Sequence, residues 1–282
     1  MIHYDAELID LNDYERSGEG ANGESYNHRS NPDLMVKIYN ETMDIDLIYF
    51  ELEVAKKVFE AGIPSPEPGT FITDGNGRYG IKFKRLTNKI SYARAVGNHP
   101  EEVEKYARMF AQMCRELHST HLKTEDFPSV KDQYLKMLAE NTYWSDKQKD
   151  FFKNLILTTP DTDTAIHGDL QYGNLLLMDG KSYFIDLGEF ATGHPYFDLG
   201  MTYVCCILNE ESFIQEFFHM SAATASRFWD FFVNEYFEGK LSTEQANELL
   251  YPYAMLKALL IERNMKGRFD QFHERFLAHY GF

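Results

Sequence analysis

The sequence predicts an α+β fold of two lobes, a small N-terminal lobe built on an antiparallel sheet with one helix and a larger, mostly helical C-terminal lobe. Apolar runs of strand length, separated by turn signals and by one helical stretch, fill residues 1–86. From Pro100 onward, most apolar residues recur at the three- and four-residue spacing of buried helix faces. A length of 282 residues suits two lobes better than one small core, and we expect them at 1–86 and 87–282.

Composition and charge narrow the class of protein. Hydrophobic residues make up 44% and aromatic residues 15% of the chain, enough for a sizeable core, so disorder is not expected. The formal net charge of −16 disfavours nucleic acid or an anionic membrane as a partner. No apolar run approaches the length of a membrane span, and the first residues lack the basic-then-apolar pattern of a secretory signal.

The three cysteines, Cys114, Cys205 and Cys206, are odd in number and lack metal-type spacing. A disulfide framework or a zinc site is therefore not expected, and the sequence favours three buried, small hydrophobic side chains. This cysteine usage fits a reducing compartment, so we expect the protein in the cytoplasm.

A glycine pattern lies near the N-terminus. Gly18, Gly20 and Gly23 fit the spacing G-x-G-x-x-G, which is a weak signal alone because two kinds of nucleotide-binding fold use it. A dinucleotide-binding fold requires a helix directly after the third glycine, but residues 24–29 are short and polar. We therefore expect a strand on each side of a glycine turn, with the glycines letting the backbone approach nucleotide phosphates.

The next segments predict a strand and then a helix. A turn signal at 31–33 precedes a strand at 34–39, which contains Lys37. Residues 44–62 have helical periodicity, and a Gly-x-Pro sequence ends the pattern. The residues that recur at helical spacing are Leu47, Phe50 or Glu51, Val54, Ala55, Val58 and Phe59. Two further strands, at 69–72 and 79–83, complete the predicted sheet.

The second lobe is predicted to be helical. An amphipathic helix ends near His118, and its apolar stripe is Val103, Tyr106, Ala107, Phe110, Met113, Cys114 and Leu117. Residues 130–157 predict two more helices, with Ser145 as the N-cap of the second. Residues 199–282 are helical and rich in aromatic residues, most of which should lie in the core.

Between these helices, residues 165–199 interrupt the helical pattern. Two apolar runs at 175–178 and 182–185 flank Asp179-Gly180, which is a hairpin turn signal.

Three polar residues mark the ends of this hairpin: Asp169 and Asn174 before it, and Asp186 just after it. Kinases use this layout, in which one aspartate accepts the proton of the attacking hydroxyl while the asparagine and the other aspartate hold Mg²⁺. Hard oxygen ligands suit such a cation.

The complete pattern is H-G-D-x-x-x-x-N at 167–174, I-D at 185–186 and G-x-P-x-x-D-L at 193–199. It resembles the aminoglycoside phosphotransferase and choline kinase family, which shares the protein-kinase-like bilobal fold. Gly168 stands where protein kinases have the arginine of H-R-D, and no A-P-E segment follows. The resemblance implies a phosphotransferase that uses ATP and Mg²⁺ and acts on the hydroxyl of a small molecule.

The resemblance also implies roles for individual residues. Asp169 would orient and deprotonate the acceptor hydroxyl, while Asn174 and Asp186 would bind Mg²⁺. Lys37 and the glycine loop at 18–23 would position the nucleotide phosphates.

The helix at 44–62 matches the family helix that carries the carboxylate partner of this lysine. Glu51 and Glu53 both qualify, and keeping Ala55 and Val58 in the core favours Glu51.

Three residues near the motif are assigned supporting roles. We expect Asp198 to cap a helix that starts at Leu199 and to brace the catalytic loop, and His167 to brace the same loop through a backbone partner. His118 is interpreted as a packing residue with satisfied hydrogen bonds.

The acceptor stays open among aminoglycosides, choline or ethanolamine, sugars and related alcohols. Residues 198–262, where the family usually builds its acceptor site, contain ten acidic and three basic residues, a net charge of −7. An acidic cleft would attract a cationic acceptor, although solvated helix faces have the same composition.

An alternative of a different class is a protein kinase or a regulatory pseudokinase that binds a protein partner. Gly168 and the missing A-P-E segment count against a protein kinase, and the intact Asp169, Asn174, Asp186 and Lys37 count against a pseudokinase.

Overall fold

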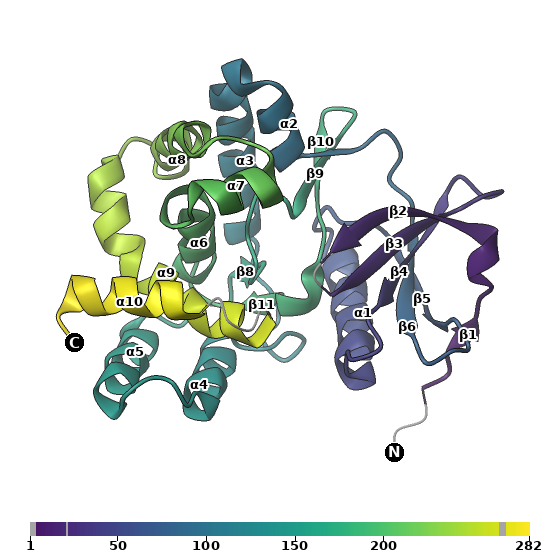
Figure 1. The fold of residues 1–282 in the computed structure, drawn as a ribbon, viewed down its shortest axis with the longest axis horizontal. Coiled ribbons are helices and arrows are strands. Elements are labelled where there is room, and N and C mark those ends of the chain that lie inside the picture. Colours follow the sequence, from purple (N-terminus) through teal and green to yellow (C-terminus); the bar gives the residue numbers. More distant parts are fainter. Residues whose placement is uncertain (1–3, 21, 265–268) are drawn as a thin grey trace. The chain divides into compact units, whose positions relative to one another are not determined.

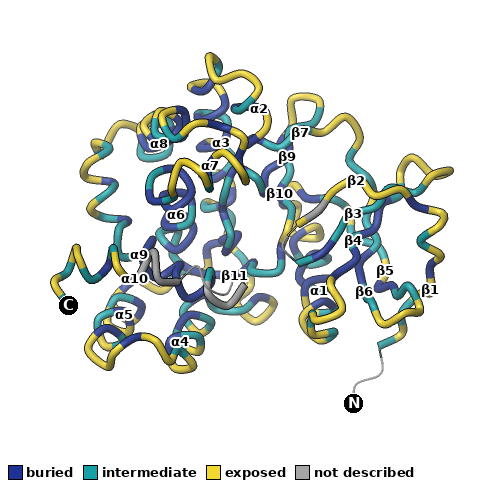
Figure 2. The backbone as a smooth tube through the Cα atoms, viewed as in Figure 1, coloured by how far each residue is buried: buried dark blue, intermediate teal, exposed yellow. Residues whose placement is uncertain are grey.

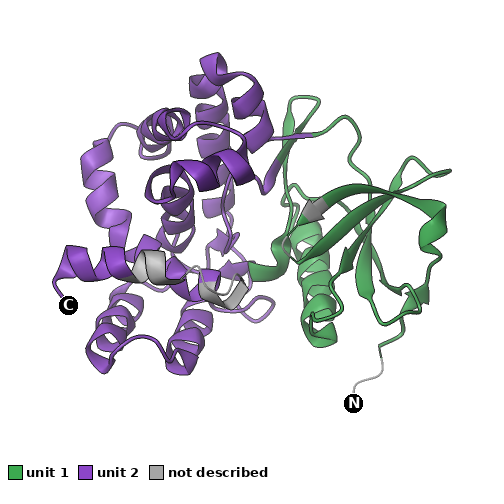
Figure 3. Ribbon diagram, in the orientation of Figure 1, with its two compact units in different colours: residues 1–89, 176–189 green, residues 90–175, 190–282 purple. Residues whose placement is uncertain are grey.

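The computed structural model describes residues 4–20, 22–264 and 269–282 (Figure 1). It divides into two compact units: Met1–Lys89 with Leu176–Glu189, and Ile90–Leu175 with Phe190–Phe282 (Figure 3). The first unit is therefore discontinuous in sequence, because a segment from the middle of the chain belongs to it.

The first unit is built on a six-stranded sheet in the order β1-β5-β6-β4-β3-β2. Its strands are β1 (Glu7–Leu8), β2 (Tyr14–Gly20), β3 (Gly23–His28), β4 (Leu34–Tyr39), β5 (Pro68–Thr73) and β6 (Tyr79–Lys84), with a 3₁₀ turn η1 (Leu11–Asp13) before β2. The predicted strands are confirmed, but the sheet is mixed rather than wholly antiparallel, because β1 pairs with β5 in parallel. The remaining neighbours are antiparallel.

Helix α1 (Ile45–Glu60) begins after Asp44, whose side chain accepts a hydrogen bond from the Asp46 N–H. It packs on the sheet through Ile48 and Leu52, which join a core with Tyr39, Phe71 and Ile81 of the strands.

The predicted helix is confirmed, but part of its predicted apolar face is wrong. Leu47, Phe50 and Phe59 are exposed, at 57%, 40% and 41%. Apolar residues occur on more than one side of this helix, and contact with the sheet selects the side that carries Ile48 and Leu52. Figure 2 shows buried and exposed residues along the same helix α1.

The predicted hairpin forms between β9 (Leu175–Met178) and β10 (Lys181–Phe184). Its turn residues Asp179 and Gly180 both have positive φ, 50° and 76°, as a two-residue hairpin turn of this hand requires. The Phe184 N–H donates to the Pro64 carbonyl at 2.8 Å and anchors the hairpin in the first unit. A 3₁₀ turn, η3 (Leu187–Glu189), then packs on α1.

The second unit is mostly helical. Its helices are α2 (Tyr92–Asn98), η2 (Pro100–Glu102), α3 (Val103–His118), α4 (Val130–Glu140), α5 (Asp146–Thr158), α6 (Tyr196–Tyr203), the π-helical turn η4 (Val204–Leu208), α7 (Glu211–Phe218), α8 (Ala222–Tyr236), α9 (Thr243–Asn264) and α10 (Phe269–Tyr280). Short strands β7 (Ile90–Ser91), β8 (Ala165–Ile166) and β11 (Ala191–Thr192) complete it, and β8 pairs with β11. Ser145 caps α5 in a reciprocal capping box with Gln148, as predicted.

Aromatic side chains form the core of this unit. Phe110 of α3 contacts the rings of Phe228 and Phe232 of α8 with centroids 5.6 and 5.7 Å apart. The three cysteines are buried, as the sequence predicts. Within the described part of the chain, no helix is both long enough and apolar enough to cross a membrane.

Two glycines of the predicted nucleotide loop differ in their surroundings. A Cβ atom at Gly23 would lie only 2.2 Å from the Ile38 carbonyl oxygen of β4, so the contact between β3 and β4 requires a glycine there. At Gly18, the nearest atom would be Ser25 Cβ at 3.7 Å, which is ordinary van der Waals contact.

We therefore expect Gly23→Ala to lower the free energy of unfolding by about 1–3 kcal/mol, the usual range for an overpacked site. The matched variant Gly18→Ala should change it by less than about 0.5 kcal/mol. Urea denaturation of both variants beside wild type measures the difference. Equal midpoints for the two variants would show that strand packing does not require Gly23.

Candidate functional site

Lys37 lies at the centre of the candidate residues in the first unit. Its Nζ donates to Glu51 Oε1 of α1 at 2.9 Å and to Asp186 Oδ1, between β10 and η3, at 2.7 Å. Asp186 is 149 residues away from Lys37 in the sequence. Glu53, the alternative partner, instead pairs with Lys56 at 2.8 Å on the surface of α1.

The two carboxylates keep Lys37 charged. Its side chain is 19% exposed and that of Glu51 is 11% exposed. Burial disfavours the charged ammonium, but the charges of Asp186 and Glu51 outweigh this effect and raise the pKa of Lys37 well above its ordinary value. The Tyr39 ring, 4.7 Å from Nζ, adds a cation–π contact.

The backbone around Asp186 is shaped for this pairing. Asp186 has a φ of 62°, in the left-handed region that aspartate tolerates better than most residues. Two residues later, a Cβ at Gly188 would lie 3.0 Å from Glu51 Oε2. The absence of a side chain at Gly188 therefore lets η3 lie against the Glu51 carboxylate.

The glycine loop is the β2–β3 hairpin. Gly18 pairs with Ser25, and Gly20 pairs with Gly23. A Cβ at Gly18 or Gly20 would meet no atom closer than 3.7 Å, and both residues are exposed. Unlike at Gly23, the protein's own packing does not demand glycine at these two positions.

Asp169 and Asn174 lie together in the second unit. Asn174 Nδ2 donates to Asp169 Oδ2 at 2.8 Å and to the Asp169 carbonyl at 3.0 Å. Asn174 is buried, at 6% exposure, and these two bonds hold its amide group in place. This bond fixes the Asp169 carboxylate relative to its own backbone.

The loop that carries Asp169 is braced by Asp198. Oδ2 of Asp198 accepts the His167 N–H at 2.6 Å, and Oδ1 accepts the Gly168 N–H at 2.7 Å. His167 in turn accepts the Asp169 N–H through Nδ1 at 3.3 Å. The predicted bracing roles of Asp198 and His167 agree with these bonds.

The predicted helix cap is wrong. Helix α6 starts at Tyr196 with Pro195 at its N-cap position, so Asp198 lies inside the first turn. The Asp198 carboxylate can therefore bind the loop 30 residues earlier in the sequence. The helix begins at a proline, which lacks an N–H, but the N–H groups at a helix start have no partner within the helix.

A buried histidine and tyrosine complete the bracing. His118 Nε2 lies 3.1 Å from Asp198 Oδ2, and its Nδ1 lies 2.8 Å from the Tyr236 hydroxyl. Burial opposes the charged form of Asp198, but the His118 hydrogen bond and the nearby charges outweigh it and lower the pKa of Asp198. Burial raises the pKa of the Tyr236 hydroxyl above its ordinary value.

Sequence reasoning missed several residues that hold the loop. Thr202 Oγ1 donates to the Leu170 carbonyl at 2.8 Å, and the Tyr172 hydroxyl donates to the Cys205 carbonyl at 2.8 Å. Lys257 of α9 donates to the Gly168 carbonyl at 2.9 Å. Lys257 is the single charge in the apolar run A-M-L-K-A-L-L-I, and that isolation was the available signal.

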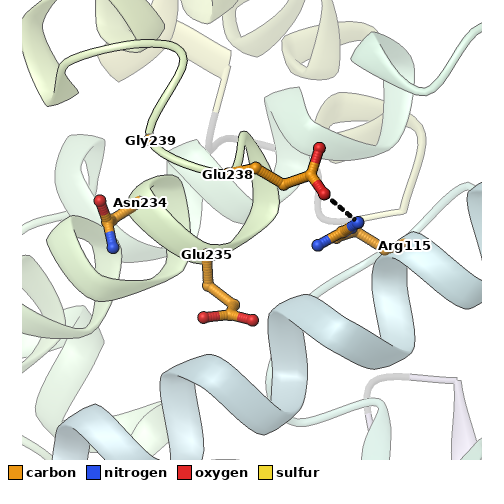
Figure 4. Close-up of a pocket in the computed structure, with 5 residues that line it drawn as sticks. All are labelled: Arg115, Asn234, Glu235, Glu238 and Gly239. Atoms are coloured by element: carbon orange, nitrogen blue, oxygen red, sulfur yellow. Dashed lines mark hydrogen bonds and ion pairs between the residues drawn. The ribbon is translucent and has the colours of Figure 1, made fainter.

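A surface pocket of the second unit involves none of the predicted site residues. It is lined by Arg115, Asn234, Glu235, Glu238 and Gly239 (Figure 4). Arg115 pairs with Glu238 at 2.7 Å, and Glu235 pairs with Arg108 at 2.8 Å. Both glutamates that line the pocket are therefore paired with arginines.

The described residues contain no cluster of three or more His, Cys, Asp or Glu side chains arranged to hold a metal ion.

The depressed pKa of Asp198 predicts a pH-dependent contribution to stability. This contribution is present above the unfolded pKa of about 3.9 and is lost as the pH falls through the lower folded value. Asp198→Asn should lower the free energy of unfolding by about 3–5 kcal/mol at pH 7, because the substitution breaks a buried charged network. Urea unfolding should show this gap between wild type and variant narrowing below about pH 4. The control Asp150→Asn, at an exposed position of α5, should match wild type at each pH. A pH-independent gap between wild type and Asp198→Asn would contradict the assignment.

Comparison with known proteins agrees with this architecture. A model of the phosphotransferase enzyme family matches residues 15–232, well over half of the chain. No curated protein sequence matches.

Several solved structures have the same fold. A thermostable mutant of aminoglycoside phosphotransferase APH(4)-Ia has a TM-score of 0.65 and 13% identity, covering 96% of both chains. Amicoumacin kinase hAmiN, in complex with AMP-PNP, Ca²⁺ and Ami, has a TM-score of 0.58 and 13% identity, over 98% of this chain and 91% of that chain.

A choline/ethanolamine kinase family protein from Mesorhizobium loti has a TM-score of 0.54 and 17% identity, over 94% of this chain and 86% of that chain. At these identities, the likeness establishes the kinase-like fold alone. The family match carries the assignment further: this chain belongs to the phosphotransferase enzyme family.

Proposed function

We propose that the protein is a kinase that transfers the γ-phosphoryl group of ATP to a hydroxyl of a small molecule. The observation that carries this proposal is Lys37, held between Glu51 and Asp186 by bonds of 2.9 and 2.7 Å. A partly buried lysine kept charged by two carboxylates suits the neutralisation of nucleotide phosphates.

The donor set fits a nucleotide and Mg²⁺. The exposed Gly18 and Gly20 leave room for phosphates to approach the backbone of the hairpin, where a side chain would intrude. Asn174 and Asp186 offer amide and carboxylate oxygens, the ligand types that Mg²⁺ prefers, and water and phosphate oxygens would complete its coordination. When bound, Mg²⁺ neutralises charge on the transferring phosphoryl group.

Asp169 is the proposed general base. The acceptor oxygen attacks the γ-phosphorus, the bond from that phosphorus to the bridging oxygen breaks, and ADP departs. The proton of the hydroxyl passes to the Asp169 carboxylate, whose orientation the Asn174 amide maintains at 2.8 Å. Lys37 stabilises the charge of the donor phosphates.

The acceptor that we favour is a cationic alcohol. Residues 198–262 carry a net charge of −7, which would concentrate positively charged molecules near the second unit. Two structural neighbours have aminoglycoside phosphotransferase or choline/ethanolamine kinase in their names, and both name cationic classes. We place the reaction in the cytoplasm, because three cysteines, an odd number without metal-type spacing, fit a reducing compartment.

Asp169→Asn should lower the turnover of ATP by about 10²–10⁴-fold, because the general base is lost while the shape of the loop is kept. Asp186→Ala should abolish turnover, because it removes a proposed Mg²⁺ ligand and one of the two carboxylates that hold Lys37. Both are measured by coupled detection of ADP, after circular dichroism has verified folding. Asp150→Asn, an exposed aspartate of α5, is the matched control and should retain wild-type turnover. Wild-type turnover in the Asp169 or Asp186 variant would refute the proposed roles.

A second experiment identifies the acceptor class. Wild-type protein with Mg²⁺ and ATP is offered aminoglycosides, choline, ethanolamine, neutral sugars and casein in separate reactions. We expect turnover to be stimulated by a cationic alcohol and not by casein. Phosphorylation of casein alone would instead support a protein kinase, and ATP binding without turnover across the panel would support a pseudokinase.

A further inference from the structure

We propose that Lys257 is a positioning residue that fixes the Gly168–Asp169 peptide and so aims the Asp169 carboxylate. The inference deepens the proposed function, because it assigns a new residue to the same site. Lys257 lies outside residues 15–232, the part of the chain that the family model matches.

Lys257 is a charged residue in the core. It is 1% exposed, and its Nζ donates to the Gly168 carbonyl at 2.9 Å across 89 residues of sequence. Taking an ammonium group out of water is costly unless strong partners compensate. The Tyr134 ring, 5.2 Å from Nζ, contributes a cation–π contact. The bond to the Gly168 carbonyl therefore explains a lysine at this position better than packing does.

The Gly168 residue is held at both of its polar groups. Its N–H donates to Asp198 Oδ1 at 2.7 Å, and its carbonyl accepts from Lys257 at 2.9 Å. One buried anion and one buried cation thus hold the residue directly before Asp169. Gly168 also has a φ of 83°, a conformation that most other residues would resist. Without a bond to the carbonyl, the flexible glycine could rotate the following peptide.

The packing of α6 on α9 brings the two charged groups to the loop. A Cβ at Gly200 of α6 would lie 2.8 Å from the Tyr253 carbonyl carbon of α9, so glycine permits a close approach of the helices. Asp198 precedes Gly200 by two residues, and Lys257 follows Tyr253 by four, about one turn. The same contact therefore positions both partners of Gly168.

The functional consequence concerns geometry rather than substrate binding. A shift of about 1 Å in a reacting group can lower a rate about 100-fold. Lys257 donates to the carbonyl of Gly168, the residue before the proposed general base. Lys37 and Gly18, the residues proposed to bind the nucleotide, belong to the other unit. Its loss should therefore lower kcat while leaving the KM for ATP within about twofold of wild type.

The test compares Lys257→Met with Lys131→Met. Methionine keeps the length of an apolar side chain and removes the donor in both variants. Lys131 is the control, because it is also largely buried, at 13% exposure, and donates to a backbone carbonyl, that of Thr159, outside residues 165–172; it also pairs with the exposed Asp161. Lys257→Gln is a third, milder variant, one atom too short to reach Gly168.

Two measurements are made on the full-length protein. Hydrogen–deuterium exchange of peptides that cover residues 165–172 reports on the loop without requiring activity. Steady-state kinetics with ATP, Mg²⁺ and the best acceptor of the panel report kcat and KM. We expect faster exchange in this segment and a kcat at least about 10-fold lower for Lys257→Met, with both quantities near wild type for Lys131→Met.

Each outcome decides the proposal. The proposal is overturned if hydrogen–deuterium exchange at residues 165–172 stays at the wild-type rate in a folded Lys257 variant. It is also overturned if exchange becomes faster while kcat stays at the wild-type value. A fall in kcat equal to that of Lys131→Met would assign Lys257 to general stability and overturn it too. If Lys257→Met does not fold, the same criteria apply to Lys257→Gln. If wild type itself lacks turnover on every acceptor, the kinase function fails, while exchange still decides whether Lys257 holds the loop.

Discussion

The buried carboxylate of Asp198 is the constraint on which the second unit's candidate site depends. It accepts two consecutive backbone N–H groups, from His167 and Gly168, and receives a third contact from His118. A carboxylate taken fully out of water is tolerated only when its lone pairs are satisfied in this way. Rearranging the loop would break several bonds to the same buried charge, so the conformation of the loop is well determined.

In the first unit, a cation rather than an anion is stabilised away from water by groups of opposite charge. Lys37 is largely buried, and it is stabilised by Glu51 of a helix and Asp186 from a distant hairpin. Because Asp186 has a left-handed backbone, the pairing depends on a locally unfavourable conformation that the surrounding elements maintain. Residues held in such sparsely populated conformations cluster at active sites and ligand-binding sites.

The glycines illustrate why a motif should be tested against packing. Gly23 is required by the close approach of β3 to β4, whereas Gly18 and Gly20 are exposed and have space for a side chain. A pattern that reads as a single phosphate-binding signature therefore combines two causes, one structural and one available for a ligand.

The sequence by itself determined the two kinds of lobe, the strand–turn–strand arrangement around the glycines and the hairpin at Asp179-Gly180, because these depend on local turn chemistry and short-range periodicity. It also indicated Asp169, Asn174 and Asp186, since their spacing is local. The buried face of α1 was only partly predicted, because apolar residues occur on more than one side of that helix and the sheet decides between them.

Only the tertiary structure decided the long-range partners. The choice of Glu51 over Glu53 depends on where α1 faces the sheet, and the role of Asp198 depends on a helix that begins earlier than predicted. Lys257 meets Gly168 across 89 residues, through a close contact between two helices. No local pattern encodes such a contact, because it is fixed by the packing of whole elements rather than by the spacing of residues along the chain.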